Sequence, residues 1–398
     1  MKTNSFSKYK VFVGLSGGVD SSVSAYLLKK MGFSVTGIFM KNWSGDEFGL
    51  QENCPWEEDQ KDAENVCRHL GIEFMSFNFE KEYKKSVIDY FFSEYSKGRT
   101  PNPDIMCNKE IKFKLFLEKS LQLGADFIAT GHYAVNHTLR KIADSYNVDY
   151  KNGLFCSADQ NKDQTYFLYS LTLNQITHTL FPIGGMTKKE IRKLAEEIKL
   201  PNAQKKDSQG ICFVGDIDVR KFLALKLGYT EGDIVDIDTN KKIGVHKGIY
   251  LYTIGQRSGI GIGGSGEPYY VAEKDTENNI LYVAKGSNNP KLFKTKIILE
   301  NLHVINGENL KKIMELRKNE SSANLVGCIR YRQNKIKIKI LDIIIESGKS
   351  IEGSFVIENP HSAEIEFLEP VKGVSPGQSL VIYLDNECIG GGVISKAE

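Results

Sequence analysis

The sequence predicts an α/β protein with an N-terminal doubly wound parallel sheet, a small central β-rich domain and a C-terminal β-barrel. Two observations lead to this prediction. In the N-terminal half, apolar runs of strand length alternate with helix-compatible stretches, as in a parallel sheet with helices on both faces. Beyond that half, the sequence becomes rich in glycine and turns, and then alternates polar with apolar residues. The expected domains are residues 1–216, 217–289 and 290–398.

The first expected strand is the unbroken apolar run Val11–Leu15, as suits a strand covered on both faces, and the helix Ser21–Met31 follows it. The other expected strands cover residues 34–40, 72–77 and 126–130, and the other helices cover residues 57–70, 80–96, 109–123 and 188–199. Ligands of such sheets bind beyond the carboxyl ends of the strands. Ser16, Met40 and Gly131 would meet there and form one candidate site.

The C-terminal half has a different pattern. One short helix precedes the turn-rich segment Tyr252–Gly261, which predicts a small β domain. The run Lys335–Ile340 then alternates lysine with isoleucine, which is the two-residue repeat of a β-strand. Several short strands of this kind, separated by glycines, predict a compact antiparallel barrel.

The turn between the first strand and its helix, residues 14–21, has the composition of a phosphate site. Gly17 and Gly18 allow a tight turn and leave room for a ligand. The helix N-terminus offers unpaired N–H groups and a partial positive charge, and nearby serines add hydroxyl donors. The string lacks both the ending of the Walker loop and the Rossmann glycine spacing. For the glycines alone, an ordinary strand–helix connection is an equally good explanation.

The charge distribution points weakly to nucleic acid. The formal net charge is only +2, but residues 291–340 hold 12 lysines and arginines against 4 glutamates. A basic segment of this kind is typical of nucleic-acid contact, although a solvated strand face is the commoner explanation of a lysine run.

The cysteines indicate a reducing compartment. They are Cys54, Cys67, Cys107, Cys156, Cys212, Cys328 and Cys388. No pair has C-x-x-C spacing, which argues against zinc ribbons and iron–sulfur ligation, and no metal held by protein ligands is expected. The sequence has no signal peptide and no apolar stretch long enough to span a membrane. We therefore expect a cytoplasmic protein without membrane contact.

Two cysteines are candidates for chemistry. Asp104 and Cys107 lie in a loop stiffened by Pro101 and Pro103, just before the helix expected from residue 109. A helix N-terminus lowers the pKa of a thiol, and Asp104 is a possible general acid or base. Cys212 is flanked by glycines and follows two lysines, which suits an accessible thiol. For Asp104 and Cys107 taken alone, a capping aspartate and a buried inert cysteine are the commoner explanation, and for Cys212 a small core residue is an equally plain one. Cys54 and Trp56 have no expected catalytic role, and packing is their default interpretation.

Longer motifs carry a resemblance to a known family. The string SGGVDSS resembles the signature of the PP-loop ATP pyrophosphatases. The strings TPNPDIMCNKEIKF, GHYA, KDQTYFL, DSQGICFVG, YTIGQRSGIGIGG, IRYRQ and PGQ follow in the order found in the tRNA-specific 2-thiouridylases, the MnmA/TrmU family of that superfamily. The match runs through all three expected domains.

The resemblance implies a tRNA-uridine 2-sulfurtransferase. In such enzymes ATP, with Mg²⁺, adenylylates the C2 oxygen of the wobble uridine, and sulfur from a cysteine persulfide replaces that oxygen. By this resemblance Cys212 carries the persulfide, Cys107 resolves it with a transient disulfide or release of hydrosulfide, and Asp104 is the acid/base residue.

The resemblance also implies binding residues. Those matching ATP-contacting positions are Gly14, Leu15, Ser16, Gly17, Gly18, Val19, Asp20, Ser21, Met40 and Gly131. Those matching tRNA-contacting positions are Asn102, Pro103, Asp104, His132, Lys162, Asp163, Gln164, Arg330, Tyr331 and Gln378. The expected partners are the tRNAs for Lys, Glu and Gln and a persulfide donor, either a relay protein or a cysteine desulfurase. A monomer is expected.

Two alternatives stay open on the residues alone. One is a PP-loop ligase that adenylylates a small-molecule oxygen for attack by an amine, which would need neither cysteine nor a basic C-terminal domain. The other is a non-catalytic tRNA-binding protein, against which the intact turn and both thiols argue. ATP consumption that depends on tRNA would separate these possibilities.

Overall fold

The structure is a computed structural model that describes residues 6–45, 56–143, 151–207, 218–262, 266–318, 324–344, 348–351, 354–357 and 362–398. The chain divides into two compact units. The first comprises Met1–Ile88, Pro103–Ile217 and Asn386–Ile389, and the second Asp89–Asn102, Asp218–Asp385 and Gly390–Glu398.

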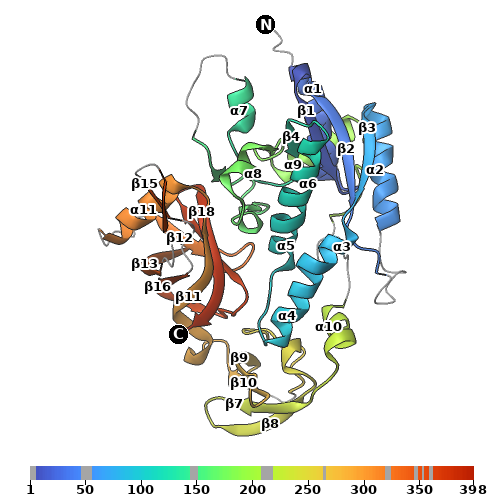
Figure 1. The fold of residues 1–398 in the computed structure, drawn as a ribbon. Helices are drawn as coiled ribbons and strands as arrows, with labels where there is room; N and C mark the ends of the chain where they lie inside the picture. The colour runs from blue at the N-terminus through green and yellow to red at the C-terminus, as the bar shows by residue number, and fades with distance from the viewer. Residues whose placement is uncertain are drawn as a thin grey trace. The chain divides into compact units, whose positions relative to one another are not determined.

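The first unit is built on a parallel sheet (Figure 1) with the strand order β3-β2-β1-β4-β6 in the described part of the chain. Its strands are β1 (Lys10–Leu15), β2 (Ser34–Lys41), β3 (Glu73–Asn78), β4 (Phe127–Ala129) and β6 (Thr179–Leu180). Strand β1 is central and pairs in parallel with β2 and β4. Five of its six residues are buried, which explains its unbroken apolar run.

Helices pack around this sheet and place its loops. They are α1 (Val19–Met31), α2 (Trp56–Leu70), α3 (Glu80–Tyr83), α5 (Pro103–Met106), α6 (Phe116–Gln122), α7 (Thr138–Ala143), α8 (Leu173–Thr177) and α9 (Lys188–Glu197). The segments η4 (Lys84–Ile88) and η5 (Cys107–Leu115) are π-helical. One core cluster joins β1, α1, α2 and α9 through residues such as Val13, Val23 and Ile191. No helix of the described residues is long and apolar enough to cross a membrane.

The second unit begins with α4 (Asp89–Ser96) and continues at α10 (Val219–Leu227). Phe222 of α10 packs against Phe91 and Phe92 of α4. A four-stranded mixed sheet follows with the order β8-β7-β10-β9. Its strands are β7 (Gly232–Asp236), β8 (Lys241–His246), β9 (Tyr269–Asp275) and β10 (Ile280–Lys285).

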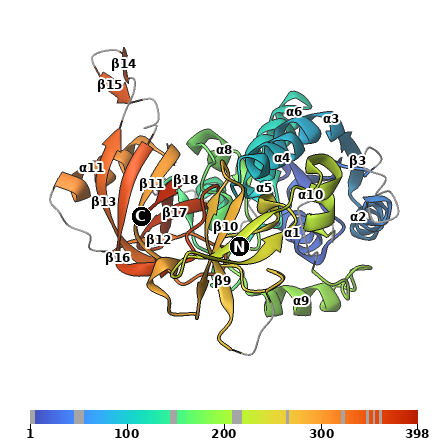
Figure 2. The same cartoon turned by 90° about the horizontal axis from the view of Figure 1, so that it is seen from below.

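The C-terminal strands close into an antiparallel barrel (Figure 2), with the order β11-β16-β13-β12-β17-β18 and a closing pair between β11 and β18. They are β11 (Phe293–Val304), β12 (Leu325–Cys328), β13 (Ile336–Ile344), β16 (Ser362–Lys372), β17 (Ser379–Leu384) and β18 (Glu387–Ala397). Helix α11 (Gly307–Lys318) and the hairpin of β14 (Gly348–Ile351) and β15 (Ser354–Ile357) lie between them in sequence. The first residues of β18 pair with β5 (Leu154–Phe155) in the first unit. The predicted fold class is confirmed.

One helix start was predicted wrongly. The helix expected from residue 109 begins at Pro103, because proline suits the first helical position and Asp104 follows in the first turn. The helix expected over 80–96 is present, and its middle part, η4, is π-helical. Strand β6 was not predicted, because a strand of only two residues is too short to show a recognisable pattern.

The turn after β6 gives a test of the packing. A Cβ on Gly184 would lie 1.8 Å from the carbonyl oxygen of Ala134, whereas one on Gly185 would meet nothing within 4 Å. We expect Gly184→Ala to lower the free energy of unfolding by about 1–3 kcal/mol. Gly185→Ala should stay within about 0.5 kcal/mol of the native protein. Urea unfolding curves of both variants measure this, and equal stabilities would contradict the packing described here.

Candidate active site

The glycine turn follows β1 and opens α1. Gly17 has a φ of 75°, and a Cβ there would lie 2.6 Å from the backbone oxygen of Asp59, so only glycine fits. Gly18 is the N-cap of α1 and contributes no side-chain cap. The first N–H groups of α1 therefore receive no capping oxygen from Gly18 and suit an anionic ligand.

Serine hydroxyls hold the turn in shape. Ser21 and Ser22 donate through Oγ to the carbonyl oxygen of Gly18, at 3.1 and 2.8 Å. Ser21 Oγ also accepts from the backbone N–H of Ser16 at 3.3 Å. Asn202 donates through Nδ2 to the carbonyl oxygen of Gly17 at 2.7 Å and to Ser22 Oγ at 3.0 Å. The turn is thus fixed before any ligand arrives.

The predicted nucleotide residues meet at this edge of the sheet. A Cβ on Gly14 would lie 3.1 Å from Cε of Met40, and one on Gly131 would lie 2.6 Å from the backbone nitrogen of Ser21. Gly131 therefore has to be glycine for the loop after β4 to pack against the start of α1. The structure brings Met40, Gly131 and the glycine turn together, as expected from their strand ends.

Asp20 is surrounded by donors. The hydroxyl of Tyr133 donates to its Oδ1 at 2.8 Å, and Lys188 Nζ lies 2.8 and 2.9 Å from its two oxygens. Burial and the Asp20 carboxylate raise the pKa of Tyr133, so its hydroxyl keeps its proton. Lys188 stands at the first position of α9.

Asp207 forms a second cluster of charges. Its carboxylate lies 2.7 Å from Lys162 Nζ, 2.6 Å from Lys188 Nζ and 2.8 Å from Arg192 Nη2. Burial alone would raise the pKa of Asp207, but hydrogen bonds from Lys162 and Lys188 lower it well below its usual value. Lys188 therefore joins the glycine turn to Asp207, which is the first residue of the DSQGICFVG motif.

Sequence reasoning missed these connecting residues. Lys188, Arg192, Tyr133 and Asn202 belong to no phosphate motif, and only their contacts identify them. One signal was present, because Asp207 begins a recognised motif and Lys205 stands two residues before it. Lys205 Nζ pairs with Asp59 at 2.7 Å and Asp62 at 2.6 Å, which attaches this stretch to α2.

The expected setting of Cys107 needs correction. Cys107 follows the four residues of α5 and begins η5, so it does not stand at a helix N-terminus as the sequence suggested. The thiol is fully buried. Its neighbour Asn108 donates through Nδ2 to the carbonyl oxygen of Phe167 at 3.1 Å. A π-helical segment often marks a functional position in a helix, and this one carries Cys107.

Cys212 and Cys54 lie outside the described residues. The transient Cys107–Cys212 disulfide therefore stays a prediction. Cys67, Cys156, Cys328 and Cys388 are buried thiols, as expected for core residues.

The second unit holds the other predicted tRNA residues. Arg330 is exposed, and its guanidinium donates to the carbonyl oxygens of Ile254, at 3.3 Å, and Gly373. The guanidinium of Arg332 lies 5.0 Å from the ring centroid of Tyr331. An aromatic ring and a guanidinium of this kind can both stack on unpaired bases.

The lysine run of β13 lies beside acidic residues of the neighbouring strand β16. Lys339 stands opposite Glu366 of β16, and Glu366 stands opposite Lys296 of β11 on its other side. The carboxylate between two lysines supports the solvated-strand explanation for this part of the basic segment. The cationic turn at residues 330–335 is the better candidate for RNA contact.

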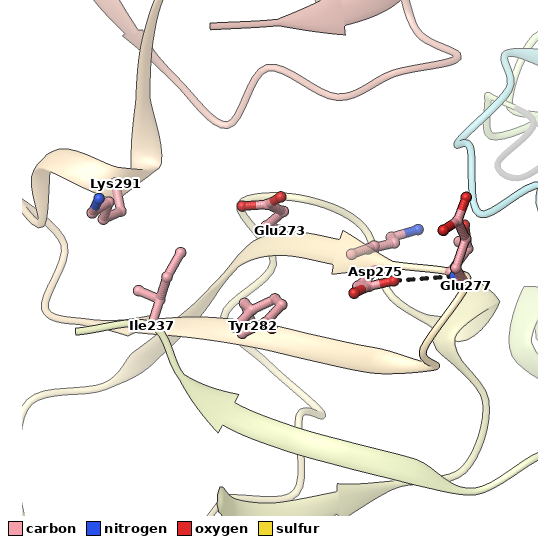
Figure 3. A pocket seen from close by; sticks show the side chains of 8 residues that line it. Ile237, Glu273, Asp275, Glu277, Tyr282 and Lys291 are labelled. Atoms are coloured by element: carbon pink, nitrogen blue, oxygen red, sulfur yellow. Dashed lines mark hydrogen bonds between the residues drawn. The ribbon is translucent and has the colours of Figure 1, made fainter. Parts of the chain in front are cut away.

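A separate cleft of about 580 Å³ lies over β9 and β10 (Figure 3). Its walls include the carboxylates of Glu273, Asp275 and Glu277. Lys274 and Lys291 also line it, and none of the predicted site residues does. This cleft thus has no part in the candidate site.

His132 gives a pH test. It is buried, and its Nδ1 lies 2.8 Å from Thr130 Oγ1. Burial, and then the charge of Lys112, lowers the pKa of His132 well below 6.5. Below pH 6.5 the unfolded chain takes up a proton that the folded chain refuses, so stability falls as the pH falls. His132→Gln should remove part of this loss, up to about 1.4 kcal/mol per pH unit.

The measurement is urea unfolding between pH 5 and 7.5 for the native protein, His132→Gln and the exposed-site control His69→Gln. The control should keep the native pH dependence. An identical pH dependence in all three proteins would show that His132 does not stay neutral in the fold.

Comparisons with known proteins agree with this architecture. Family models match residues 9–216 (tRNA methyl transferase HUP domain), 220–285 (tRNA methyl transferase PRC-barrel domain) and 344–394 (aminomethyltransferase beta-barrel domain). The chain is 46% identical over 395 residues to a tRNA-specific 2-thiouridylase MnmA from Pectobacterium carotovorum subsp. carotovorum (strain PC1), covering 98% of each chain. It is 44% identical over 386 residues to one from Staphylococcus carnosus (strain TM300), covering 97% of this chain and 95% of the relative.

Proposed function

This chain belongs to the tRNA-specific 2-thiouridylase family, and on that premise we propose how its residues carry out the reaction. The observation that supports this proposal most is the glycine turn at the N-terminus of α1. Met40 and Gly131 lie beside the turn, and Lys188 pairs with its Asp20. This arrangement suits ATP, with the pyrophosphate on the turn and the adenosine toward Met40.

The first step activates the uridine. The C2 oxygen of the wobble uridine attacks the α-phosphorus of ATP, the bond to the β-phosphate breaks, and pyrophosphate leaves. N–H groups of the turn and the nearby lysines stabilise the charge that develops on pyrophosphate. Asp104 takes the uridine N3 proton that is lost when the O2-adenylate forms. AMP attached to the oxygen is then a good leaving group.

The second step transfers sulfur. The terminal sulfur of a Cys212 persulfide attacks C2, and the C2–oxygen bond breaks to release AMP. The Cys107 thiolate then attacks the inner sulfur of Cys212, the sulfur–sulfur bond of the persulfide breaks, and its electron pair goes to the new thiocarbonyl. A Cys107–Cys212 disulfide results, and an external thiol must reduce it before the next turnover.

Mg²⁺ fits this site as a companion of ATP. The described residues contain no group of three or more metal-ligating side chains, so a cage made by the protein alone is absent from them. Asp20 offers one carboxylate beside the turn, and Mg²⁺ is usually held by one or two carboxylates and substrate phosphates. The bound ion would screen the charge on the phosphates.

The substrate is proposed to be a tRNA with uridine at the wobble position, those for Lys, Glu and Gln. The contacts proposed on the second unit are Asn102, Arg330, Tyr331 and Gln378, and those on the first are Pro103, Asp104, His132, Lys162, Asp163 and Gln164. Lys162 and Gln164 already have structural partners, Asp207 and the backbone N–H of Tyr133. The persulfide donor would be a relay protein or a cysteine desulfurase.

Methyl transfer, named in two of the domain descriptions, is a weaker alternative. Relatives that span nearly the whole chain carry the thiouridylase name. A methyl donor would not need a turn built for pyrophosphate, whereas adenylylation does.

The cysteines provide the test. With unmodified tRNA, ATP, Mg²⁺ and a persulfide donor, we expect the native protein to form 2-thiouridine, measured by nucleoside mass spectrometry. Cys212→Ser should form none because it lacks the sulfur carrier, and Cys107→Ser should lose most of its product. The control Cys328→Ala, in the barrel, should retain activity. Full activity in Cys212→Ser would overturn the sulfur assignment, and ATP cleavage without thiolation would favour a small-molecule ligase.

A further inference from the structure

Within the second unit, the barrel holds residues 99–101, which come directly before the Asn102–Asp104 stretch, here called the catalytic loop. The backbone N–H of Thr100 donates to the carbonyl oxygen of Pro376 at 2.9 Å. Gln378 donates through Nε2 to the carbonyl oxygen of Thr100 at 2.8 Å and to that of Pro101 at 3.3 Å. Thr100 is 8% exposed and Pro101 is also buried, so water cannot readily replace these bonds.

The surrounding contacts leave little freedom to this segment. Gly377 has a φ of 91°, and a Cβ there would lie 2.7 Å from the backbone nitrogen of Thr100. Arg99 pairs with Glu94 of α4 at 2.9 Å and also with Glu300 of β11. Three consecutive residues, 99–101, are therefore fixed by side chains and backbone of the same unit.

Gln378 thus has a structural task besides the tRNA contact expected from sequence. Its amide group donates hydrogen bonds to the carbonyl oxygens of the two residues that immediately precede Asn102. A buried carbonyl that loses its donor costs about 1–3 kcal/mol, so the backbone would move to find another partner. Such movement would displace Asn102 and, two residues later, Asp104.

We propose that Gln378 is a positioning residue for the Asn102–Asp104 stretch and acts through the carbonyl groups of Thr100 and Pro101. The inference rests on the proposed function, in which Asp104 takes the N3 proton of the uridine and Asn102 and Pro103 contact the tRNA. It assigns the barrel a part in the chemical step in addition to RNA binding. A barrel loop that only contacts tRNA would change affinity, whereas one that sets the catalytic loop changes the rate at saturating tRNA.

The test uses the full chain with Gln378→Met, which keeps the length of the side chain but removes its hydrogen bonds. Single-turnover thiolation at saturating tRNA should slow by about ten- to a hundredfold, as expected for a small misplacement of reacting groups. Because Gln378 is also a proposed tRNA contact, the dissociation constant for tRNA is measured by filter binding as well, so that saturation is verified and a loss of affinity is separated from the loss of saturated rate. Gln378→Lys, which keeps an N–H donor, should recover most of the rate, and the exposed β16 control Glu369→Gln should behave as native.

A second readout does not depend on activity. Hydrogen–deuterium exchange of the amides in residues 99–106 should be about five- to tenfold faster in Gln378→Met than in the native protein, with β11 and β16 unchanged. Unchanged exchange there would overturn the proposal, and so would weaker tRNA binding with an unchanged saturated rate. If the native protein forms no 2-thiouridine, the proposed function fails, while the exchange result still decides whether Gln378 holds the loop.

Discussion

The Asp20 carboxylate at the start of α1 is the constraint on which the first unit depends. A negative charge stands inside a turn whose N–H groups are suited to anions, and it needs donors of its own. Lys188 and Tyr133 supply them, each at 2.8 Å from Oδ1. Tyr133 comes from the loop after β4 and Lys188 from the start of α9, so one carboxylate ties three separate parts of the chain together.

Lys188 extends this connection to Asp207, which also binds Lys162 and Arg192. Lys162 belongs to the KDQ motif, and Asp207 begins the motif that contains Cys212. Asp20 of the glycine turn, Lys162 and Asp207 are thus linked through a short chain of partly buried ion pairs. Partly buried ion pairs are screened less by salt than exposed ones, so they can hold the loops in fixed positions.

The sequence predicted the fold class well because it follows from local patterns, and the same kind of pattern led to the proposed nucleotide edge. Unbroken apolar runs marked β1 and β2, and glycines at a strand end marked the turn. It failed where structure depends on distant partners. The helix start at Pro103 placed Cys107 inside a helix and buried it, and no local pattern shows that burial.

The same limit applies to Gln378 and Lys188. The family resemblance marked Gln378 as an RNA contact, but its bonds to Thr100 and Pro101 join residues 277 and 278 positions apart in sequence. Lys188 was expected only as the first residue of a helix. Contacts of this range are fixed by tertiary packing, which neither periodicity nor spacing describes.

The most direct measurement follows the fate of the uridine oxygen. A tRNA carrying oxygen-18 at C2 of its wobble uridine is thiolated with unlabelled ATP in ordinary water, and the AMP is examined by mass spectrometry. Attack of this oxygen on the α-phosphorus predicts one oxygen-18 atom in each AMP formed. Unlabelled AMP together with 2-thiouridine would contradict adenylylation of the base and, with it, the role proposed for the glycine turn.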